Sequence, residues 1–368
     1  MKRFFVCMVI LSMALFGCKG KEDVIRIGVA GPMTGPQAKL GSDFRNGVTI
    51  AVDDWNSRGG LLGKKIEIVV ADDQADPKQA VSVANKLVNE GVAGVIGHFN
   101  SSCSIPASDV YNRAGIPMIT PASTNPQLTE RGYTGVFRVC GRDDQQGRVA
   151  AEFVLRKLAL KRVAIIHDKT TYGQGLSGEF RKNLGAGVEV VYSGGVTLGD
   201  KDFKTVLTSI KAKNPELIYF GGIYPEAGLL VKQSRELGLT VPFMSGDGSI
   251  DLKFVEIAGA EAAEGTYLTF SPDPKNTPQA KGFIDAYTAR FGDLGPYSIY
   301  AYDAVTALLS AIKEAGSAEG KTVIGKLHTS KFSGASGTCV FMEKGDVAGA
   351  PYVVWITRAG KFEEFWRP

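Results

Sequence analysis

The feature that most constrains the fold of this 368-residue chain is a steady alternation of short β-rich runs with amphipathic stretches. The first half predicts strands at 24–30, 66–71, 92–97 and 117–120, with helices near 41–57, 77–90 and 104–114. After a polar break at 140–146 the alternation restarts, with strands at 162–168, 188–192, 217–221 and 242–246 and helices near 172–184, 202–213 and 225–237. Alternation of this kind implies parallel strands joined by crossover helices, so the sequence predicts two similar α/β halves.

The C-terminal part is too small to form a third domain. It predicts helices at about 278–291 and 298–315 and β-rich segments at 339–342 and 352–357. A length of 368 residues suggests about two domains of ~100 to 200 residues each. We therefore expect this tail to return to the two earlier halves and complete them.

The first residues have the pattern of a signal peptide. Lys2 and Arg3 precede an apolar run at 4–16, which is shorter than the ~20 residues of a membrane-spanning helix. Leu15-Phe16-Gly17-Cys18 resembles a bacterial lipobox, in which the cysteine is lipidated after removal of the peptide before it. We expect a lipoprotein signal peptide at 1–17 and a lipid anchor on Cys18; cleavage nearby without lipid is the alternative. The mature chain then lies in the periplasm or on the outer face of the cytoplasmic membrane.

Charge and cysteine content narrow the function classes. Lys and Arg number 42 and Asp and Glu 38, with no basic run in the body of the chain, so we expect no nucleic acid partner. Beyond the signal region only Cys103, Cys140 and Cys339 remain, without a CxxC pair, which argues against a structural zinc site. A disulfide between Cys140 and Cys339 is possible, but three buried free thiols are the expected arrangement.

Polar residues gather where strands of the first half end. In an open parallel sheet, ligands bind beyond the carboxyl ends of the strands, so two facing halves predict a shared cleft and a hinge. Ser101 lies in a hydroxyl-rich segment at 98–104 that precedes a helix, which suits a carboxylate, although plain N-capping is the alternative. The loop at 120–126 offers the Ala122 carbonyl and the Thr124 hydroxyl and N–H to the two ends of a zwitterion, or serves only as a Pro-rich connector.

The second half supplies an acidic residue at a strand end. Asp247 lies between Gly246 and Gly248, where its carboxylate could pair with a ligand ammonium or form an Asx turn. The segment Gly173-Gln174-Gly175-Leu176-Ser177-Gly178 satisfies GxGxxG, but Lys169 to Tyr172 separate it from the preceding strand, so we interpret it as a coincidental match.

Many short stretches, in one order, carry a family resemblance over essentially all of the mature length. The chain resembles the periplasmic leucine/isoleucine/valine-binding proteins of bacterial ABC importers at Asp76-Pro77-Lys78-Gln79-Ala80-Val81, Val95-Ile96-Gly97-His98, Ile119-Thr120-Pro121-Ala122, Thr129-Glu130-Arg131-Gly132-Tyr133, Val163-Ala164-Ile165-Ile166-His167-Asp168-Lys169 and Glu343-Lys344-Gly345-Asp346. The resemblance implies two Rossmann-like lobes joined by a three-segment hinge, with the ligand cleft between them. It places lobe 1 at 23–142 plus 271–350 and lobe 2 at 143–270 plus 351–368.

The same resemblance implies roles for individual residues. Ser101 matches a serine that binds the ligand carboxylate, and Thr124 a threonine that serves both charged ends. Ala122 offers its carbonyl to the ammonium, which Asp247 faces from the position of a family glutamate. Tyr172 matches a tyrosine that closes over the ligand, and Ser123 belongs to the same loop as Ala122 and Thr124. Four further residues are predicted to shape the pocket for the ligand side chain: Leu40, Ile223, Tyr224 and Tyr297.

The resemblance predicts an extracytoplasmic substrate-binding protein. It would capture an apolar L-amino acid, branched-chain or related, and deliver it to a membrane permease and its ATPase. We expect a monomer without metal or cofactor and without enzymatic activity. Two alternatives remain open: a sensor that uses the same fold to regulate a partner, and an α/β enzyme that uses His98 or His167, although local hydrogen bonding is the expected role of both histidines.

Overall fold

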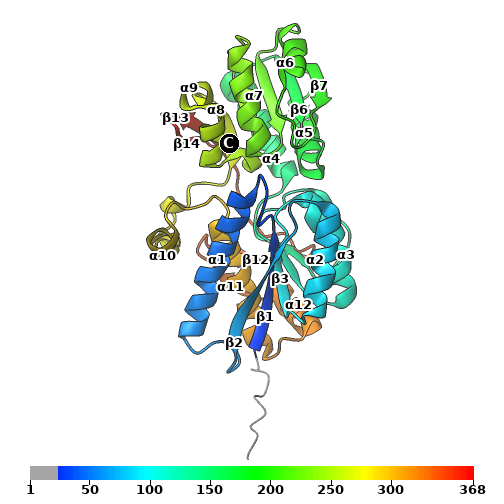
Figure 1. The fold of residues 1–368 in the computed structure, drawn as a ribbon, viewed down its shortest axis with the longest axis vertical. Coiled ribbons are helices and arrows are strands. Elements are labelled where there is room, and N and C mark those ends of the chain that lie inside the picture. Colours follow the sequence, from blue (N-terminus) through cyan, green and yellow to red (C-terminus); the bar gives the residue numbers. More distant parts are fainter. Residues whose placement is uncertain (1–23) are drawn as a thin grey trace, which may run out of the picture.

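The computed structural model describes residues 24–368, and the predicted signal peptide at 1–17 and Cys18 lie outside the described residues. The described chain forms two lobes stacked along the long axis of the molecule (Figure 1). Each lobe has one sheet with helices on both faces, all parallel in one lobe and parallel with two antiparallel strands in the other, so the predicted α/β class is confirmed. Within residues 24–368, no helix combines the length and apolarity of a transmembrane span.

The lower lobe of Figure 1 holds a five-stranded sheet in the order β2-β1-β3-β4-β5, and all its neighbouring strands are parallel. Its strands are β1 Val24–Gly31, β2 Lys65–Asp72, β3 Gly94–Gly97, β4 Met118–Thr120 and β5 Val136–Arg138. The connecting helices are α1 Ala38–Ser57, α2 Pro77–Asn89 and α3 Ser101–Ala114, and a short 3-10 turn, η1, covers Pro126–Leu128. The buried side chains of Ile25, Ile27 and Val29 in β1 belong to one hydrophobic core of this lobe, whereas Ala30 belongs to a separate one.

The upper lobe holds a seven-stranded sheet in the order β14-β13-β10-β9-β8-β6-β7. Its strands are β6 Arg162–His167, β7 Glu189–Gly195, β8 Leu217–Gly221, β9 Phe243–Ser245, β10 Tyr267–Phe270, β13 Val353–Arg358 and β14 Lys361–Trp366. Its helices are α4 Asp143–Glu152, which continues as the π-helical segment η2 Phe153–Leu158, α5 Thr171–Leu184, α6 Lys204–Lys211, α7 Tyr224–Glu236, η3 Asp247–Ser249, α8 Leu252–Ala258 and α9 Ala260–Ala263. The first five strands of both lobes thus have the same spatial order, 2-1-3-4-5, which places a binding crevice beyond the carboxyl ends of the strands.

The tail returns to both lobes, as the sequence predicts. Its elements beside the lower lobe are η4 Pro274–Asn276, η5 Pro278–Ala280, α10 Lys281–Phe291, α11 Ser298–Ala315, α12 Gly320–Thr329, β11 Lys331–Ser333 and β12 Thr338–Val340. The buried face of α11 belongs to the hydrophobic core of the lower lobe, whereas β13 pairs antiparallel with β10 of the upper sheet. The chain therefore crosses between the sheets three times, near 139–142, 271–280 and 347–352.

The polar segment at 140–146 is not only a break between the halves. Helix α4 begins inside it at Asp143, and Gly147 allows α4 to approach α5 closely, because an added Cβ would lie less than 3.0 Å from backbone atoms of Glu179 and Phe180. Several further elements were not predicted from the sequence: β5, α8, α9, β10, α12, β11 and β14. Cys103, Cys140 and Cys339 are buried free thiols, which confirms the expected arrangement.

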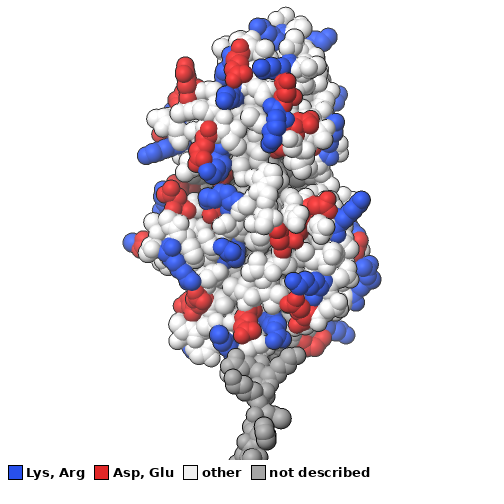
Figure 2. Space-filling model, viewed as in Figure 1, with Lys and Arg blue, Asp and Glu red and all other residues white. Residues whose placement is uncertain are grey.

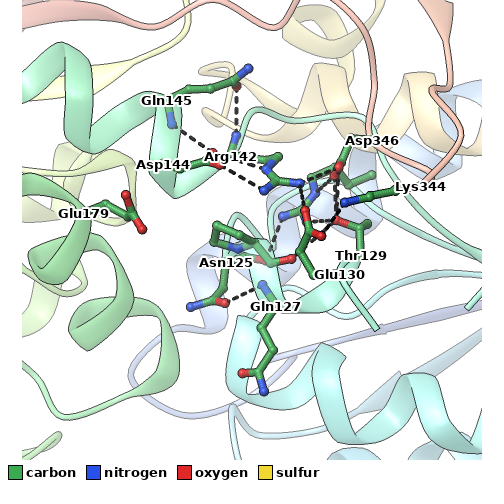
Figure 3. A network of polar contacts seen from close by, with 12 residues as sticks. Asn125, Gln127, Thr129, Glu130, Arg142, Asp144, Gln145, Glu179, Lys344 and Asp346 are labelled. Carbon is green, nitrogen blue, oxygen red and sulfur yellow. Dashed lines mark hydrogen bonds and ion pairs between the residues drawn. The ribbon is translucent and has the colours of Figure 1, made fainter. Parts of the chain in front are cut away.

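An ionic network ties the first crossing to the third. Arg138 is fully buried and binds Asp346 at 2.6 Å, and Arg142 binds the same carboxylate at 2.7 Å. Figure 3 shows Arg142 also reaching Glu130 and Asp144. Although burial opposes it, the charge of Arg138 lowers the pKa of Asp346. The paired charges hold these two crossings at a fixed spacing. On the face seen in Figure 2, Lys and Arg alternate with Asp and Glu over both lobes.

Candidate functional site

A cavity lies between the lobes, at the carboxyl ends of strands from both sheets. Its free volume is about 20 Å³, well below the ~300–1,000 Å³ of small-molecule sites. Its lining combines the ends of β3 and β4 with the starts of α3, α5 and η3: Phe99, Asn100, Ser101, Ser102, Ala122, Thr170, Tyr172, Ile223, Asp247, Gly248 and Tyr297. Six of the ten predicted ligand-binding residues are among them.

Asp247 is the acidic group of this cavity. It follows β9 in the short turn η3, and its side chain is buried. Tyr172 donates a hydrogen bond to one carboxylate oxygen at 2.7 Å, and Tyr297 to the other at 3.0 Å. Burial raises the pKa of Asp247. No Lys, Arg or His is among the described residues that line the cavity. A cationic ligand group would therefore relieve the cost of burying this carboxylate.

Two residues of the first lobe present hydroxyl groups near the same place. Ser101 begins α3, and its Oγ accepts a hydrogen bond from the amide of Asn125 at 3.3 Å. Thr124 is fully buried, and its hydroxyl has no hydrogen-bond partner among the described residues. Ala122 lines the cavity between them in the sequence. An unsatisfied buried hydroxyl is costly, so Thr124 favours a ligand that supplies the missing partner.

Four predicted site residues lie outside the cavity lining. The Ser123 hydroxyl is directed into the lower lobe, where it bonds Ser104 Oγ at 2.6 Å and donates to the Phe99 carbonyl at 2.9 Å, so this side chain is not available to a ligand. Tyr224 donates its hydroxyl to the Pro36 carbonyl of the other lobe at 2.6 Å. Leu40 is packed in the hydrophobic core that spans both lobes, and Thr124 lies behind the lining.

Phe99 and Asp143 were not among the predicted site residues. Phe99 lines the cavity and packs edge-on against Tyr297, with ring centroids 4.9 Å apart. Asp143 is fully buried at the start of α4, and neither of its carboxylate oxygens has a hydrogen-bond partner among the described residues. Burial, reinforced by the charge of Asp247, raises its pKa well above the ordinary value. Its amide donates to the Thr124 carbonyl at 2.9 Å, so this second acid lies beside the predicted zwitterion site.

The histidines and the GxGxxG segment have local explanations. His98 is fully buried between Asp73 at 2.7 Å and Tyr111 at 3.0 Å, and His167 accepts a hydrogen bond from the Lys169 amide. The first two glycines of the segment are packing positions, because an added Cβ on Gly173 would meet Asp168 and Gly221, and one on Gly175 would meet Asn125 of the other lobe. Within residues 24–368, no three His, Cys, Asp or Glu side chains are grouped so as to hold a metal ion.

The first five strands of each lobe have the same order, the chain crosses between the lobes three times, and a polar cavity lies between them. These features define a two-lobed binding protein of the type I periplasmic class. The chain belongs to the periplasmic binding protein family, whose sequence profile matches residues 24–361.

Similar proteins agree with this assignment. An amino acid binding protein of Pseudomonas aeruginosa is 45% identical over 336 residues, covering 90% of each chain. A leucine-, isoleucine-, valine-, threonine- and alanine-binding protein of the same species is 40% identical, over 96% of this chain and 95% of that one. Two solved structures superpose with TM-scores of 0.87 and 0.86: the leucine binding protein LivK of Thermotoga maritima, 33% identical and covering 94% and 99% of the two chains, and the isoleucine complex of LivJ from Streptococcus pneumoniae, 31% identical and covering 94% and 100%.

Proposed function

We propose that this chain is the extracytoplasmic substrate-binding protein of an ABC importer and captures an apolar L-amino acid, branched-chain or related, between its lobes. One observation carries the proposal: a single cavity is bounded by Ser101 of one lobe and by the buried carboxylate of Asp247 of the other. Hydroxyl and amide donors on one side and an acid on the other suit the two ends of a zwitterion.

Each charged end of the ligand has candidate partners. Ser101 and the Thr124 amide would receive the carboxylate, while Asp247, the Ala122 carbonyl and the Thr124 hydroxyl would receive the ammonium. Tyr172 is bonded to Asp247 and would close over the ligand from the second lobe. Charge-assisted hydrogen bonds contribute roughly 1.5–3 kcal/mol each, and micromolar affinity requires about 8 kcal/mol. Four or five such contacts are therefore sufficient after the costs of association.

The apolar part of the lining supports an apolar ligand side chain. Phe99, Ile223 and Tyr297 supply its hydrocarbon surface, and no cationic side chain is among the described lining residues to receive a second carboxylate. The relatives named as leucine-, isoleucine- and valine-binding proteins support the same ligand class. The closed, ligand-bound form would be presented to the membrane permease and its ATPase, with the chain held at the membrane through Cys18.

Calorimetry on the mature chain tests the two-ended clamp directly. We expect L-leucine, L-isoleucine or L-valine to bind more tightly than L-glutamate or L-lysine. The matched controls for L-leucine are 4-methylpentanoate, which lacks the ammonium, and isoamylamine, which lacks the carboxylate. Each should bind at least about a hundredfold more weakly, because one end of the site then stays unpaired. Equal affinity for either control, or binding of polar amino acids only, would contradict the proposal.

The importer role needs a test in cells. Deletion of the gene should abolish saturable uptake of the amino acid that binds in calorimetry, and the intact gene should restore it. A Cys18→Ala version should restore less uptake if the lipid anchor keeps the protein near its permease. Unchanged uptake in the deletion strain would favour the sensor alternative over transport.

A further inference from the structure

A second, larger cavity lies behind the amino acid site, at the hinge. It encloses about 370 Å³ and is lined by residues of all three crossings: 139–141, 270–272 and 347–352. Asp247 and Tyr297 line both cavities and form the partition between them. The hinge cavity is reached from the surface, because Thr338 and Ala348 in its lining are exposed whereas Asp247 at its inner end is buried.

The lining of the hinge cavity has the composition of a site for a cation. It contains four aromatic rings, Phe270, Tyr297, Tyr300 and Tyr352. It also contains two carboxylates, Asp247 and Asp303, and no Lys, Arg or His among its described lining residues. Aromatic faces attract organic cations, and buried carboxylates favour positive charge near them, whereas an anion would find no partner here.

One polar group of this lining is left unused. Tyr352 is only 5% exposed, and its hydroxyl makes no hydrogen bond to another described residue. Its ring, from the third crossing, lies against Gly141 of the first crossing, where an added Cβ would come under 3.0 Å from the ring. By contrast, both carboxylate oxygens of Asp303 accept hydrogen bonds, from the backbone amides of Ala335 and Ser336. Tyr352 therefore offers a free donor and acceptor to a molecule inside the cavity.

The two thiols in the lining do not suggest a covalent or metal site. Burial raises the pKa of Cys140 strongly and that of Cys339 to about 12, so both remain neutral thiols at physiological pH.

We infer that the hinge cavity is a second ligand site, which takes a small organic ammonium ion with an apolar or aromatic body. Its walls come from all three crossings, so an occupant contacts the segments whose geometry sets the angle between the lobes. It also shares Asp247 with the amino acid site. Here the inference rests on the proposed function: the ammonium of the second ligand and that of the amino acid would compete for Asp247. We therefore expect each ligand to lower the binding affinity of the other by the same factor.

Benzylamine at pH 7.5 is a suitable probe, and benzyl alcohol is its neutral counterpart of nearly equal shape. Calorimetry and ligand-observed NMR should show benzylamine binding at least about tenfold more tightly than benzyl alcohol. Ala350→Phe, at a half-buried lining position without a side-chain hydrogen bond, should fill the cavity and weaken benzylamine by about tenfold while L-leucine affinity stays within roughly threefold. Tyr352→Phe should weaken benzylamine several-fold through loss of the free hydroxyl.

Ser101→Ala changes the amino acid site and is the counterpart of Ala350→Phe in the hinge cavity. It should weaken L-leucine by about tenfold and leave benzylamine within roughly threefold. If benzylamine binding falls in Ser101→Ala but not in Ala350→Phe, the amine occupies the amino acid site and the inference is wrong. Equal binding of benzyl alcohol, or no binding of benzylamine at millimolar concentration, would also overturn it. Failure of L-leucine to bind the unmodified chain contradicts the proposed function alone, because the benzylamine measurements do not use it.

Discussion

At the residue scale, the buried carboxylate of Asp247 gives the sharpest prediction. Asp247→Asn keeps the shape of the side chain and removes its charge, so we expect the affinity for L-leucine to fall at least about a hundredfold, or about 3 kcal/mol. The chain without ligand should not be destabilised, because burial of the charged form is unfavourable and raises the pKa of Asp247. Calorimetry measures the first effect and thermal unfolding the second.

Two outcomes would contradict this role for Asp247. Unchanged affinity would remove the carboxylate from the ligand contacts. A large decrease in the unfolding temperature of the ligand-free variant would instead make Asp247 a structural acceptor for the hydroxyls of Tyr172 and Tyr297.

A second residue, Asp303 of α11, predicts a pH dependence of stability. Burial raises the pKa of this carboxyl from 3.8 to about 6. Between these values the folded chain holds a proton that the unfolded chain has released, so the free energy of unfolding decreases as the pH rises. The decrease amounts to about 3 kcal/mol at most. We expect Asp303→Asn to show a correspondingly smaller decrease between pH 4 and pH 7 in urea denaturation.

The control for Asp303→Asn is Asp285→Asn, which removes an exposed carboxylate from α10. It should leave the pH dependence of the wild-type chain unchanged. If Asp303→Asn also follows the wild-type curve, the Asp303 carboxyl does not titrate between pH 4 and pH 7 in the folded state.

The sequence predicted where several site residues lie, but it did not predict the directions of all their side chains. Ser101, Ala122 and Asp247 could be placed because strand ends of parallel sheets share one edge, and the structure brings them to one cavity. The direction of the Ser123 hydroxyl could not be predicted, because its partners Ser104 and Phe99 belong to another segment of the chain. Asp143 looked like part of a polar linker, but it is fully buried at the start of α4.

At the scale of elements, the GxGxxG segment gives a test within one helix. Gly173 lies at the start of α5, where an added Cβ would come under 3.0 Å from Asp168 Oδ1 and the Gly221 carbonyl. We expect Gly173→Ala to lower the free energy of unfolding by about 1–3 kcal/mol through overpacking. Gly178→Ala, later in α5, has no atom within 4 Å of the new Cβ and should raise stability by up to about 1 kcal/mol. Urea denaturation distinguishes the two. Equal effects would mean that helix propensity, not contact with β8, determines the result.

Strands and helices with strong periodicity were predicted well, and those defined by tertiary contact were not. Strands β1, β6 and β8 are mostly apolar and buried, and their predicted bounds differ from the observed ones by no more than a residue at each end. Helix α4 escaped prediction because Asp143-Asp144-Gln145-Gln146-Gly147 has a helix-poor, polar composition, and its packing against α5 compensates for this. The edge strand β14 forms only because the tail returns to β13.

At the scale of the whole molecule, the lobes meet through few polar contacts. Tyr224 donates to Pro36 at 2.6 Å, Asn125 to Thr171 at 2.9 Å and Tyr297 to Asp247 at 3.0 Å, each across the cleft. Such contacts are present only when the lobes are close together. A ligand that contacts both lobes favours the same arrangement, so these bonds and the ligand stabilise one closed state in common.

Tyr224→Phe isolates the contribution of closure, because it removes one hydroxyl from the interface between the lobes and keeps the ring. A hydrogen bond contributes about 0.5–1.5 kcal/mol, so the affinity for L-leucine should fall by roughly two- to twelvefold. Without ligand, the radius of gyration in small-angle X-ray scattering should increase, while the unfolding of each lobe is unaffected. Tyr111→Phe is the matched control, since its hydroxyl bonds His98 within one lobe at 3.0 Å. It should lower stability and leave both the affinity and the radius of gyration unchanged. If both variants change affinity equally, the effect reflects general destabilisation, and closure does not depend on the contact between Tyr224 and Pro36.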